Sequence, residues 1–239
     1  MTVVAKVYIV RHGETDHNRQ GIIQGQLDTP LNAAGVRQAQ LAADALEDVP
    51  FESDGGAAYS SDLQRARKTA EIILEKHPGV KLEITEALRE RHMGDWQGGS
   101  VHNRGDPPPN LEPIVDFLSR SVNWWNKTIS KHTQRKVAEL RALESTSSAQ
   151  DGLEAGERLS EFEPAHILVV SHGGLIGTLV TNLIGSRKVR AAEGVVVGRC
   201  FNASISVIHI EEDGKGVLVS YADTTHLNVD LVQENADIQ

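Results

Sequence analysis

Short apolar runs alternate along this sequence with longer segments that have helical periodicity. Runs of this length, bounded by glycine, proline and small polar residues, are typical of buried β-strands. Because they alternate with helices, they predict an α/β fold, a three-layer sandwich with a mostly parallel central sheet flanked by helices. The expected strands cover residues 3–10, 57–60, 80–84 and 166–171, followed by a hairpin of 203–210 and 216–222 that closes the sheet.

Three segments between these runs are predicted to be helices. The first begins at Asn32, a residue type that caps helix N-termini. The second begins at the capping-box spacing of Ser61 and Gln64 and ends before the Pro-Gly pair at 78–79. The third covers residues 175–185, an apolar segment that directly follows two glycines.

An insertion separates the third and fourth expected strands, at about residues 101–163. Its apolar residues recur at helical spacing over 111–129, so this part is expected to be a helix packed on the sheet. Residues 145–163 are polar and are expected to be mobile. We expect residues 1–239 to form a single domain that carries this insertion, because α/β domains of this length often form one unit.

Composition limits the partners and the compartment. The net charge of -9 argues against a broad surface for nucleic acid or membrane, although a local basic pocket could bind a small anion. Cys200 is the single cysteine, which rules out an intrachain disulfide and favours a reducing compartment. The N-terminal run is too short and polar for a signal peptide or membrane span. We therefore expect a cytoplasmic protein, with the nucleus as a second location; a homodimer is compatible with the sequence.

Charged and titratable residues follow four of the expected strands. Arg11 and His12 end the first strand, Arg65 lies on the helix after the second, Glu90 follows the third and His172 follows the fourth. In open α/β sheets, ligands bind beyond the carboxyl ends of the strands. The sequence therefore predicts that these five side chains meet at one edge of the sheet.

This set of residue types suits phosphoryl chemistry. Guanidiniums match phosphate oxygens, and the helix start at Gly173 adds backbone donors and a favourable dipole. A neutral histidine can attack phosphorus and form a phosphoramidate that water later cleaves. Arginines and a second histidine would stabilise the charge on the phosphoryl oxygens without a metal. Glu90 is the natural acid for the leaving alkoxide, provided that it holds a proton near neutral pH.

Five ordered motifs resemble those of the histidine phosphatase superfamily, the phosphoglycerate-mutase-like enzymes. The resemblance covers nearly the whole chain and becomes weaker in the insertion. The matching segments are RHGET at 11–15, followed by Asn18, QGQLDTPLNAAG at 24–35, SDLQRARKTA at 61–70, LRERHMGDWQG at 88–98 and SHGG at 171–174.

The resemblance implies roles for particular residues. His12 would be the phosphorylated nucleophile and Glu90 the proton donor, and no metal or organic cofactor is implied. The expected phosphate ligands are Arg11, Arg65, Asn18 and His172, with Gln24, Gly25 and Gly173 as further phosphate-binding residues.

The superfamily contains both mutases and phosphatases. Mutases that resemble this chain carry a long basic stretch after the acid motif, whereas this chain has GGSVHNRGDPPPN at 98–110. The sequence therefore favours a phosphatase that acts on a small phosphorylated metabolite, a phosphate monoester. The alternatives are a phosphoglycerate-mutase-type phosphotransferase, a non-catalytic phospho-ligand binder, and a metal hydrolase using His12, Glu14 and His172. A zinc-deaminase pattern would need more than one cysteine.

Simpler interpretations compete with each site assignment. Arg65 could pair with Asp62 or Glu71 on the surface of its helix. The carboxylates that compete with Glu90 for the acid role are Glu14, Glu86 and Asp95.

Residues near the expected acid have open roles. The tryptophans are expected to pack rather than to bind substrate, and they are Trp96, Trp124 and Trp125. Three basic residues either line the pocket mouth and bind a second anionic group or are solvated loop positions: His92, His102 and Arg104.

Overall fold

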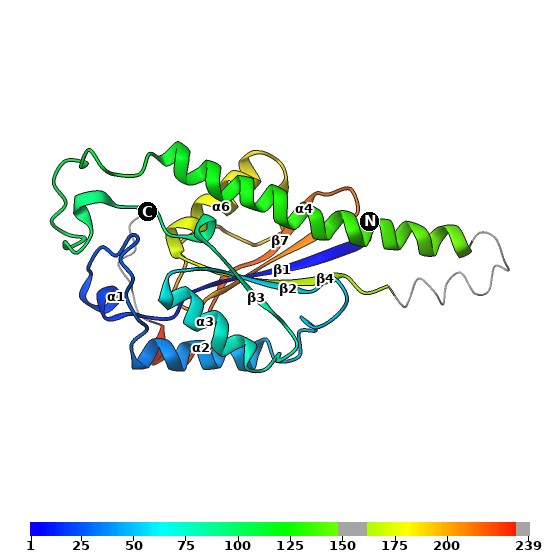
Figure 1. Cartoon of the computed structure of the whole chain (residues 1–239), viewed down its shortest axis with the longest axis horizontal. Helices are drawn as coiled ribbons and strands as arrows, with labels where there is room; N and C mark the ends of the chain where they lie inside the picture. Colours follow the sequence, from blue (N-terminus) through cyan, green and yellow to red (C-terminus); the bar gives the residue numbers. More distant parts are fainter. Residues whose placement is uncertain (148–161, 233–239) are drawn as a thin grey trace.

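The computed structural model describes residues 1–147 and 162–232, and Figure 1 shows the chain with its helices and strands labelled. The strands are β1 (Val3–Arg11), β2 (Ala57–Ser61), β3 (Leu82–Thr85), β4 (Ala165–Ser171), β5 (Val189–Ala191), β6 (Ile205–Glu211) and β7 (Gly216–Asp223). The helices are α1 (Asp16–Gln20), α2 (Ala33–Ala45), α3 (Gln64–Leu74), α4 (Ile114–Ser147) and α6 (Gly173–Gly185), with short 3₁₀ turns η1 (Glu86–Leu88), η2 (Gly94–Trp96) and η3 (Val229–Leu231).

The strands form one mixed, mostly parallel sheet in the order β3-β2-β4-β1-β6-β7-β5. The pairs β1-β4, β2-β4, β2-β3 and β5-β7 are parallel, while β6 runs antiparallel to both β1 and β7. The expected α/β architecture is confirmed. The expectation that the β6-β7 hairpin closes the sheet is wrong, because the three-residue strand β5 pairs with β7 and forms that edge.

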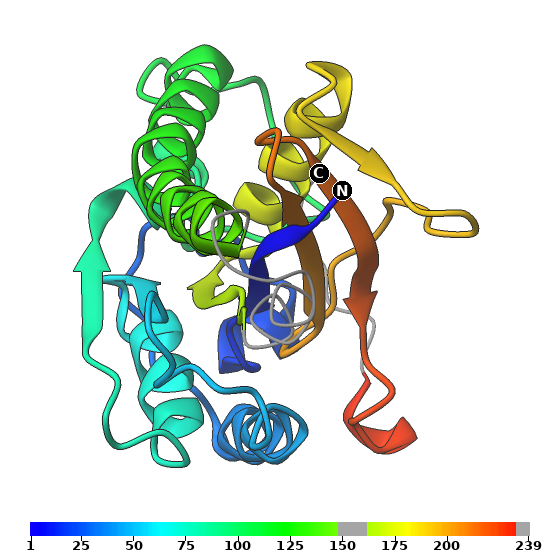
Figure 2. The same cartoon turned by 90° about the vertical axis from the view of Figure 1, so that its right-hand side faces the viewer.

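Helices cover both faces of the sheet, and Figure 2 shows the three layers end-on. Successive side chains of a strand point to opposite faces, so a strand covered on both faces is apolar at consecutive positions. In β4, Ile167 and Val169 pack in the cluster beneath α4 and α6, whereas Leu168 and Val170 pack in the cluster beneath α2 and α3. This arrangement explains the uninterrupted apolar run in the sequence.

The start of α3 differs from the expected capping box. The N-cap residue is Leu63, whose side chain makes no capping bond. Asp28 acts instead from a distant loop: its Oδ1 accepts the Gln64 N–H at 2.7 Å, and Gln64 Nε2 donates to the Asp28 carbonyl at 2.6 Å. A carboxylate at a helix N-terminus is stabilising whichever segment supplies it. This long-range cap fixes the 24–35 segment against α3.

The insertion is largely one helix. The expected helix over 111–129 is confirmed in type, but α4 is longer and extends to Ser147. Its buried side, which includes Phe117, Trp125 and Ile129, packs on the α6 face of the sheet. Most of the polar stretch 145–163, which we expected to be mobile, lies outside the described residues. Within the described part of the chain, no helix combines the length and apolarity needed to cross a membrane.

Two glycines allow the turn after β1 to pack against the first turn of α2. A Cβ on Gly13 would lie 2.4 Å from the Gly35 carbonyl oxygen, and a Cβ on Gly35 would lie 2.1 Å from the Glu14 carbonyl oxygen. Both distances are too short for any side chain. The contact therefore holds the His12 turn against a helix end, with the Asn32 N–H donating to the Glu14 carbonyl at 3.0 Å.

We expect Gly35→Ala to lower the free energy of unfolding by about 1–3 kcal/mol or more, because backbone atoms on both sides must move to admit the methyl group. The matched control is Gly185→Ala, also in a helix, where no described atom lies within 4 Å of the added Cβ. That change should be neutral or stabilise by about 0.4–1 kcal/mol. Urea denaturation measures both, and equal effects of the two substitutions would contradict the packing argument.

Candidate active site

The sheet register brings the first and fourth strand ends together. Arg11 pairs with Ser171, and the His12 N–H donates to the Ser171 carbonyl at 2.9 Å. His12 and His172 therefore follow neighbouring parallel strands, and their ring centroids lie 5.1 Å apart. Ser61, at the end of β2, borders the same place, because β2 is the other parallel neighbour of β4. The prediction that these strand ends meet is confirmed.

His12 is buried and is held in one tautomer. Its Nδ1 lies 2.7 Å from the Gly13 carbonyl, which can only accept, so Nδ1 carries the proton. Its Nε2 accepts from Arg65 Nε at 3.3 Å, so the lone pair is on Nε2. Burial, and then the positive charges of Arg65 and Arg11, lower the pKa of His12 well below 6.5. The imidazole is neutral at pH 7, and its Nε2 is available as a nucleophile.

Two buried guanidiniums flank the imidazole. Arg65 donates from Nη1 to the Leu27 carbonyl at 2.7 Å and from Nη2 to the Gly25 carbonyl at 2.8 Å. Arg11 donates from Nη1 to the Cys200 carbonyl at 2.7 Å. Carbonyl oxygens carry no net charge, so these bonds fix the guanidiniums without cancelling their charge.

The surface-pair interpretation of Arg65 is wrong. Asp62 pairs with Arg89, and Glu71 lies near Arg67 and Lys68. Arg65 itself is 1% exposed, with its guanidinium inside the site.

His172 lies at the N-cap of α6 and is fully buried. Its Nε2 is 2.9 Å from Ser61 Oγ, which also accepts the Leu63 N–H. Its Nδ1 is a buried atom with no hydrogen-bond partner among the described residues. Burial and the positive charge of Arg65 are the main causes that lower the pKa of His172 well below 6.5.

Glu90 follows η1 in the chain, and its carboxylate contacts the start of α6. Its Oε2 accepts the Gly174 N–H at 2.9 Å and its Oε1 accepts the Arg91 N–H at 2.8 Å. Gly174 permits this approach, since a Cβ there would lie 2.6 Å from Glu90 Oε1. Helix N-termini stabilise anions, so this carboxylate occupies a natural anion position.

The competing carboxylates have other partners. Glu86 is exposed beside Arg89, Asp95 accepts from Asn110, and Glu14 accepts from Asn32 Nδ2 at 2.7 Å. Of these four described residues, Glu90 alone lines the cavity that contains His12.

Of the remaining expected phosphate-binding residues, three line the cavity and one is buried outside its lining. Gln24, Gly25 and Gly173 line the cavity. Gly25 has φ +51° and its carbonyl holds Arg65, so glycine suits this position. Asn18 is buried, and its Oδ1 accepts the Thr15 N–H at 3.2 Å in a capping box of α1. Asn18 is therefore placed to support the turn after His12.

A cavity of about 950 Å³ is lined by His12, Arg65 and Glu90. Arg11, Asn18 and His172 are buried and do not line it. Among the pocket-mouth candidates, Arg104 lines it, with its guanidinium 5.6 Å from the ring centroid of Trp96. Trp96 also lines the cavity, whereas Trp125 is buried in the core and Trp124 packs on Tyr59. His92 Nδ1 accepts the Gly94 N–H, a loop contact.

Sequence reasoning missed an ion pair that holds the Glu90 loop. Arg120, on α4, donates to the carbonyls of Ala87, Arg89 and Glu90 at 2.7–3.0 Å. Its Nε pairs with Glu112 Oε1 at 2.8 Å, and Glu112 Oε2 also accepts the His92 N–H. No local sequence signal identified it, because Arg120 lies on the side of the expected helix opposite its apolar stripe.

Smaller supports were also missed. Thr69 Oγ1 accepts the Gly13 N–H at 3.0 Å, and Asn202 Nδ2 donates to the His12 carbonyl at 2.9 Å. Both fix the backbone around His12, and both come from segments remote in sequence.

In the described part of the chain, no three His, Cys, Asp or Glu side chains are grouped so as to hold a metal ion. In the metal-hydrolase alternative, Glu14 would join His12 and His172. Its carboxylate instead contacts Asn32 and lies 3.5 Å from Arg19 Nε.

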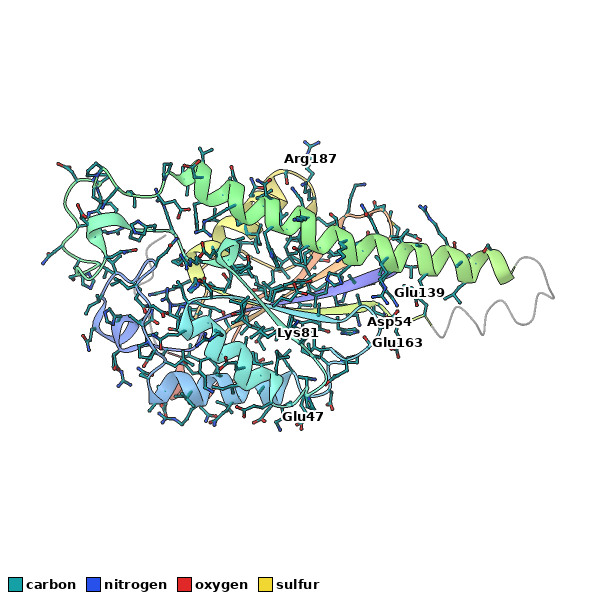
Figure 3. The ribbon with its side chains drawn as sticks, in the orientation of Figure 1. Glu47, Asp54, Lys81, Glu139, Glu163 and Arg187 are labelled. Atoms are coloured by element: carbon teal, nitrogen blue, oxygen red, sulfur yellow. The ribbon has the colours of Figure 1, made fainter. Side chains whose placement is uncertain are left out.

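Some of the acidic residues lie at the end of the molecule away from the site. Figure 3 shows Asp54, Glu139 and Glu163 at the end of the molecule where β1 begins, opposite the carboxyl ends of the parallel strands. The net charge of -9 therefore coexists with a local site in which Arg11 and Arg65 create a positive field. A local field of this kind focuses a small anion into the site.

The model of the histidine phosphatase superfamily (branch 1) matches residues 7–140, so the chain belongs to this superfamily. The chain is 30% identical to the metal-independent phosphoserine phosphatase of Arabidopsis thaliana, over 98% of this chain and 88% of that protein. It is 32% identical to phosphoglycerate mutase-like protein 4 of Arabidopsis thaliana, over 93% and 87%. Among solved structures, it resembles a mycobacterial glucosyl-3-phosphoglycerate phosphatase with a TM-score of 0.61 and 26% identity, over 92% and 100%.

The neutral buried histidines predict a pH dependence of stability. Their folded pKa lies below the unfolded value of about 6.5, so the unfolded chain takes up more protons as the pH falls and stability decreases below that value. Each histidine should contribute a loss of roughly 1 kcal/mol between about pH 7.5 and 5.5. In urea denaturation, His172→Gln should reduce the pH dependence by that amount; an unchanged dependence would show that His172 is protonated in the fold.

Proposed function

We propose that this protein is a phosphatase that hydrolyses a phosphate monoester of a small metabolite through a phosphohistidine on His12. The observation that carries the proposal is the state of His12, a neutral imidazole with its lone pair on Nε2, which contacts Arg65 and lies in the field of Arg11, in a cavity that Glu90 also lines. A neutral nitrogen nucleophile beside fixed cations is what covalent phosphoryl transfer needs. Membership of the superfamily, and the phosphatases among its similar members, support the same activity.

The reaction has two displacements. In the first, His12 Nε2 attacks phosphorus, the ester P–O bond breaks, and the leaving oxygen takes a proton from Glu90. In the second, water attacks phosphorus and gives a proton to the Glu90 carboxylate, and the P–N bond breaks to release phosphate and free His12. Arg11, Arg65 and His172 would bind the phosphoryl oxygens throughout.

The proton on Glu90 depends on the substrate. In the structure, two backbone N–H groups donate to the carboxylate, which favours its ionised form. A bound phosphoryl group adds negative charge next to this carboxylate and favours its protonation. In this proposal, Glu90 therefore takes up its proton together with the substrate.

The mutase-type alternative is less consistent with the chain. Mutase chemistry needs the phosphorylated product to stay bound for a second transfer. The segment 98–110 contributes Arg104 to the cavity and has no long basic stretch that could hold such a product.

The nucleophile can be identified by trapping. Rapid acid-free quenching after mixing with a ³²P-labelled monoester should leave label on the protein that survives alkali and is lost in acid, and His12→Ala should abolish it. In the presence of 3-phosphoglycerate the label should leave as inorganic phosphate. His172→Ala, which removes a phosphate ligand, serves as the control and should weaken labelling without abolishing it. Label on His12→Ala would overturn the assignment of His12 as the nucleophile. Efficient transfer of label to 3-phosphoglycerate would overturn the choice of a phosphatase over a mutase.

The role of Glu90 can be tested with two leaving groups. An alkoxide needs a proton in the transition state, and general acid catalysis is worth about 10²- to 10⁴-fold, whereas a nitrophenolate leaves largely unaided. Glu90→Gln should therefore slow single-turnover phosphorylation by about that factor with an alkyl phosphate and far less with p-nitrophenyl phosphate. Equal losses with both substrates would mean that Glu90 binds or positions the substrate.

A further inference from the structure

The cavity continues beyond the phosphoryl end, along one side of α6. The residues of this helix that line it follow helical spacing, and they are Gly173, Gly174, Gly177, Thr178, Thr181, Asn182 and Gly185. They form one face, because such positions lie above one another on a helix. With a rise of 1.5 Å per residue, the part of this face from Gly174 to Gly185 is about 16 Å long. Its small residues leave a groove that begins beside Glu90 at Gly174.

The opposite wall of the groove is apolar. It is formed by the start of α4 and the segment before it, and its apolar side chains include Met93, Trp96, Leu111, Ile114 and Phe117. Phe117 is buried in the core cluster, while Ile114 is 51% exposed and borders the cavity at the first residue of α4. An exposed isoleucine at a cavity rim gains free energy when a ligand covers it.

Few charges are available in this part of the cavity. Apart from the phosphoryl-end residues, the ionisable side chains among its lining are Arg91 and Arg104. Arg91 Nε donates to the Glu112 carbonyl at 2.8 Å, so it helps to hold the loop. Arg104 is exposed and lies over Trp96. The described residues of the groove therefore offer no cluster of cations for a second phosphate.

We infer that the substrate is a phosphate monoester whose alcohol has an extended, uncharged and mainly apolar body, and that this body lies in the groove between α6 and the start of α4. The inference rests on the proposed phosphatase activity. Phosphate is held at the His12 end, and the body is selected by apolar contact with the α4 wall. Thr178 and Thr181 on the α6 wall accommodate hydroxyl or ether groups along one edge of such a body.

A series of unbranched alkyl phosphates tests the groove. Burial of one methylene contributes about 0.8 kcal/mol, so kcat/KM should rise about fourfold per methylene from ethyl to octyl phosphate, at concentrations below micelle formation. The gain should stop once the chain fills the groove. Glycerol 2-phosphate and 6-phosphohexanoate, which carry polar or charged bodies, should be poorer substrates than hexyl phosphate.

Neighbouring residues of α4 provide a matched pair of variants. Ile114 lines the cavity and is 51% exposed, whereas Val115 is 67% exposed and is not among the lining residues. Ile114→Ser should lower kcat/KM for octyl phosphate several-fold and leave ethyl phosphate unchanged, while Val115→Ser should change neither. Thr181→Trp, at an exposed helix position, should obstruct the groove and shorten the chain length at which the gain stops.

The outcomes separate the two proposals. Equal kcat/KM for all chain lengths, or equal effects of Ile114→Ser and Val115→Ser, would overturn the apolar groove while the phosphatase assignment stands. A preference for 6-phosphohexanoate over hexyl phosphate would likewise overturn it and assign Arg104 to a second anion. No release of phosphate from any ester by the full-length protein would instead overturn the phosphatase proposal itself.

Discussion

The parallel pairing of β1 with β4 is the constraint on which the site depends. Its register places Arg11 opposite Ser171, and each strand ends one residue before a histidine-glycine pair. Parallel strands end at the same edge, so the two imidazoles meet without any contact between distant loops. The His12 N–H bond to the Ser171 carbonyl continues the strand pairing into the site. A one-residue slip of one strand would move its histidine to the other face of the sheet, away from the second histidine.

Burial of two arginines and two histidines at this edge has an energetic cost, which the backbone reduces. A buried charge is costly unless it is hydrogen-bonded. Carbonyls of Gly25, Leu27 and Cys200 accept from the guanidiniums, and these carbonyls lie in turns where strand pairing does not use them. The imidazoles remain neutral, which avoids further buried charge. The carbonyls that accept these hydrogen bonds are uncharged, so they do not neutralise the guanidiniums. The same arrangement therefore reduces the cost of burying the arginines and keeps a positive field that favours a bound anion such as phosphate.

The features that were predictable from sequence are encoded locally. The run 166–171 followed by His-Gly-Gly specifies a buried strand, its end and a helix start within one short segment, and the same holds for Arg11 and His12 after β1. The features that were missed depend on contacts between remote segments. The cap of α3 comes from Asp28, the loop of Glu90 is held by Arg120 on α4, and the sheet edge is the three-residue β5. None has a local pattern, because each interaction is defined only when the sheet has assembled.

The helix α4 contacts the Glu90 loop and also forms part of the apolar wall of the groove. Arg120 holds the carbonyl of Glu90 from the same helix that presents Ile114 and Phe117 to the groove. These residues lie within two turns, so a rigid shift of the α4 start would move the Glu90 loop and the apolar wall together. The Glu112 carboxylate strengthens the connection, since it pairs with Arg120 and accepts the His92 N–H. His12 is fixed by the sheet, so a change in the position of α4 would move the Glu90 loop and the apolar wall of the groove relative to it.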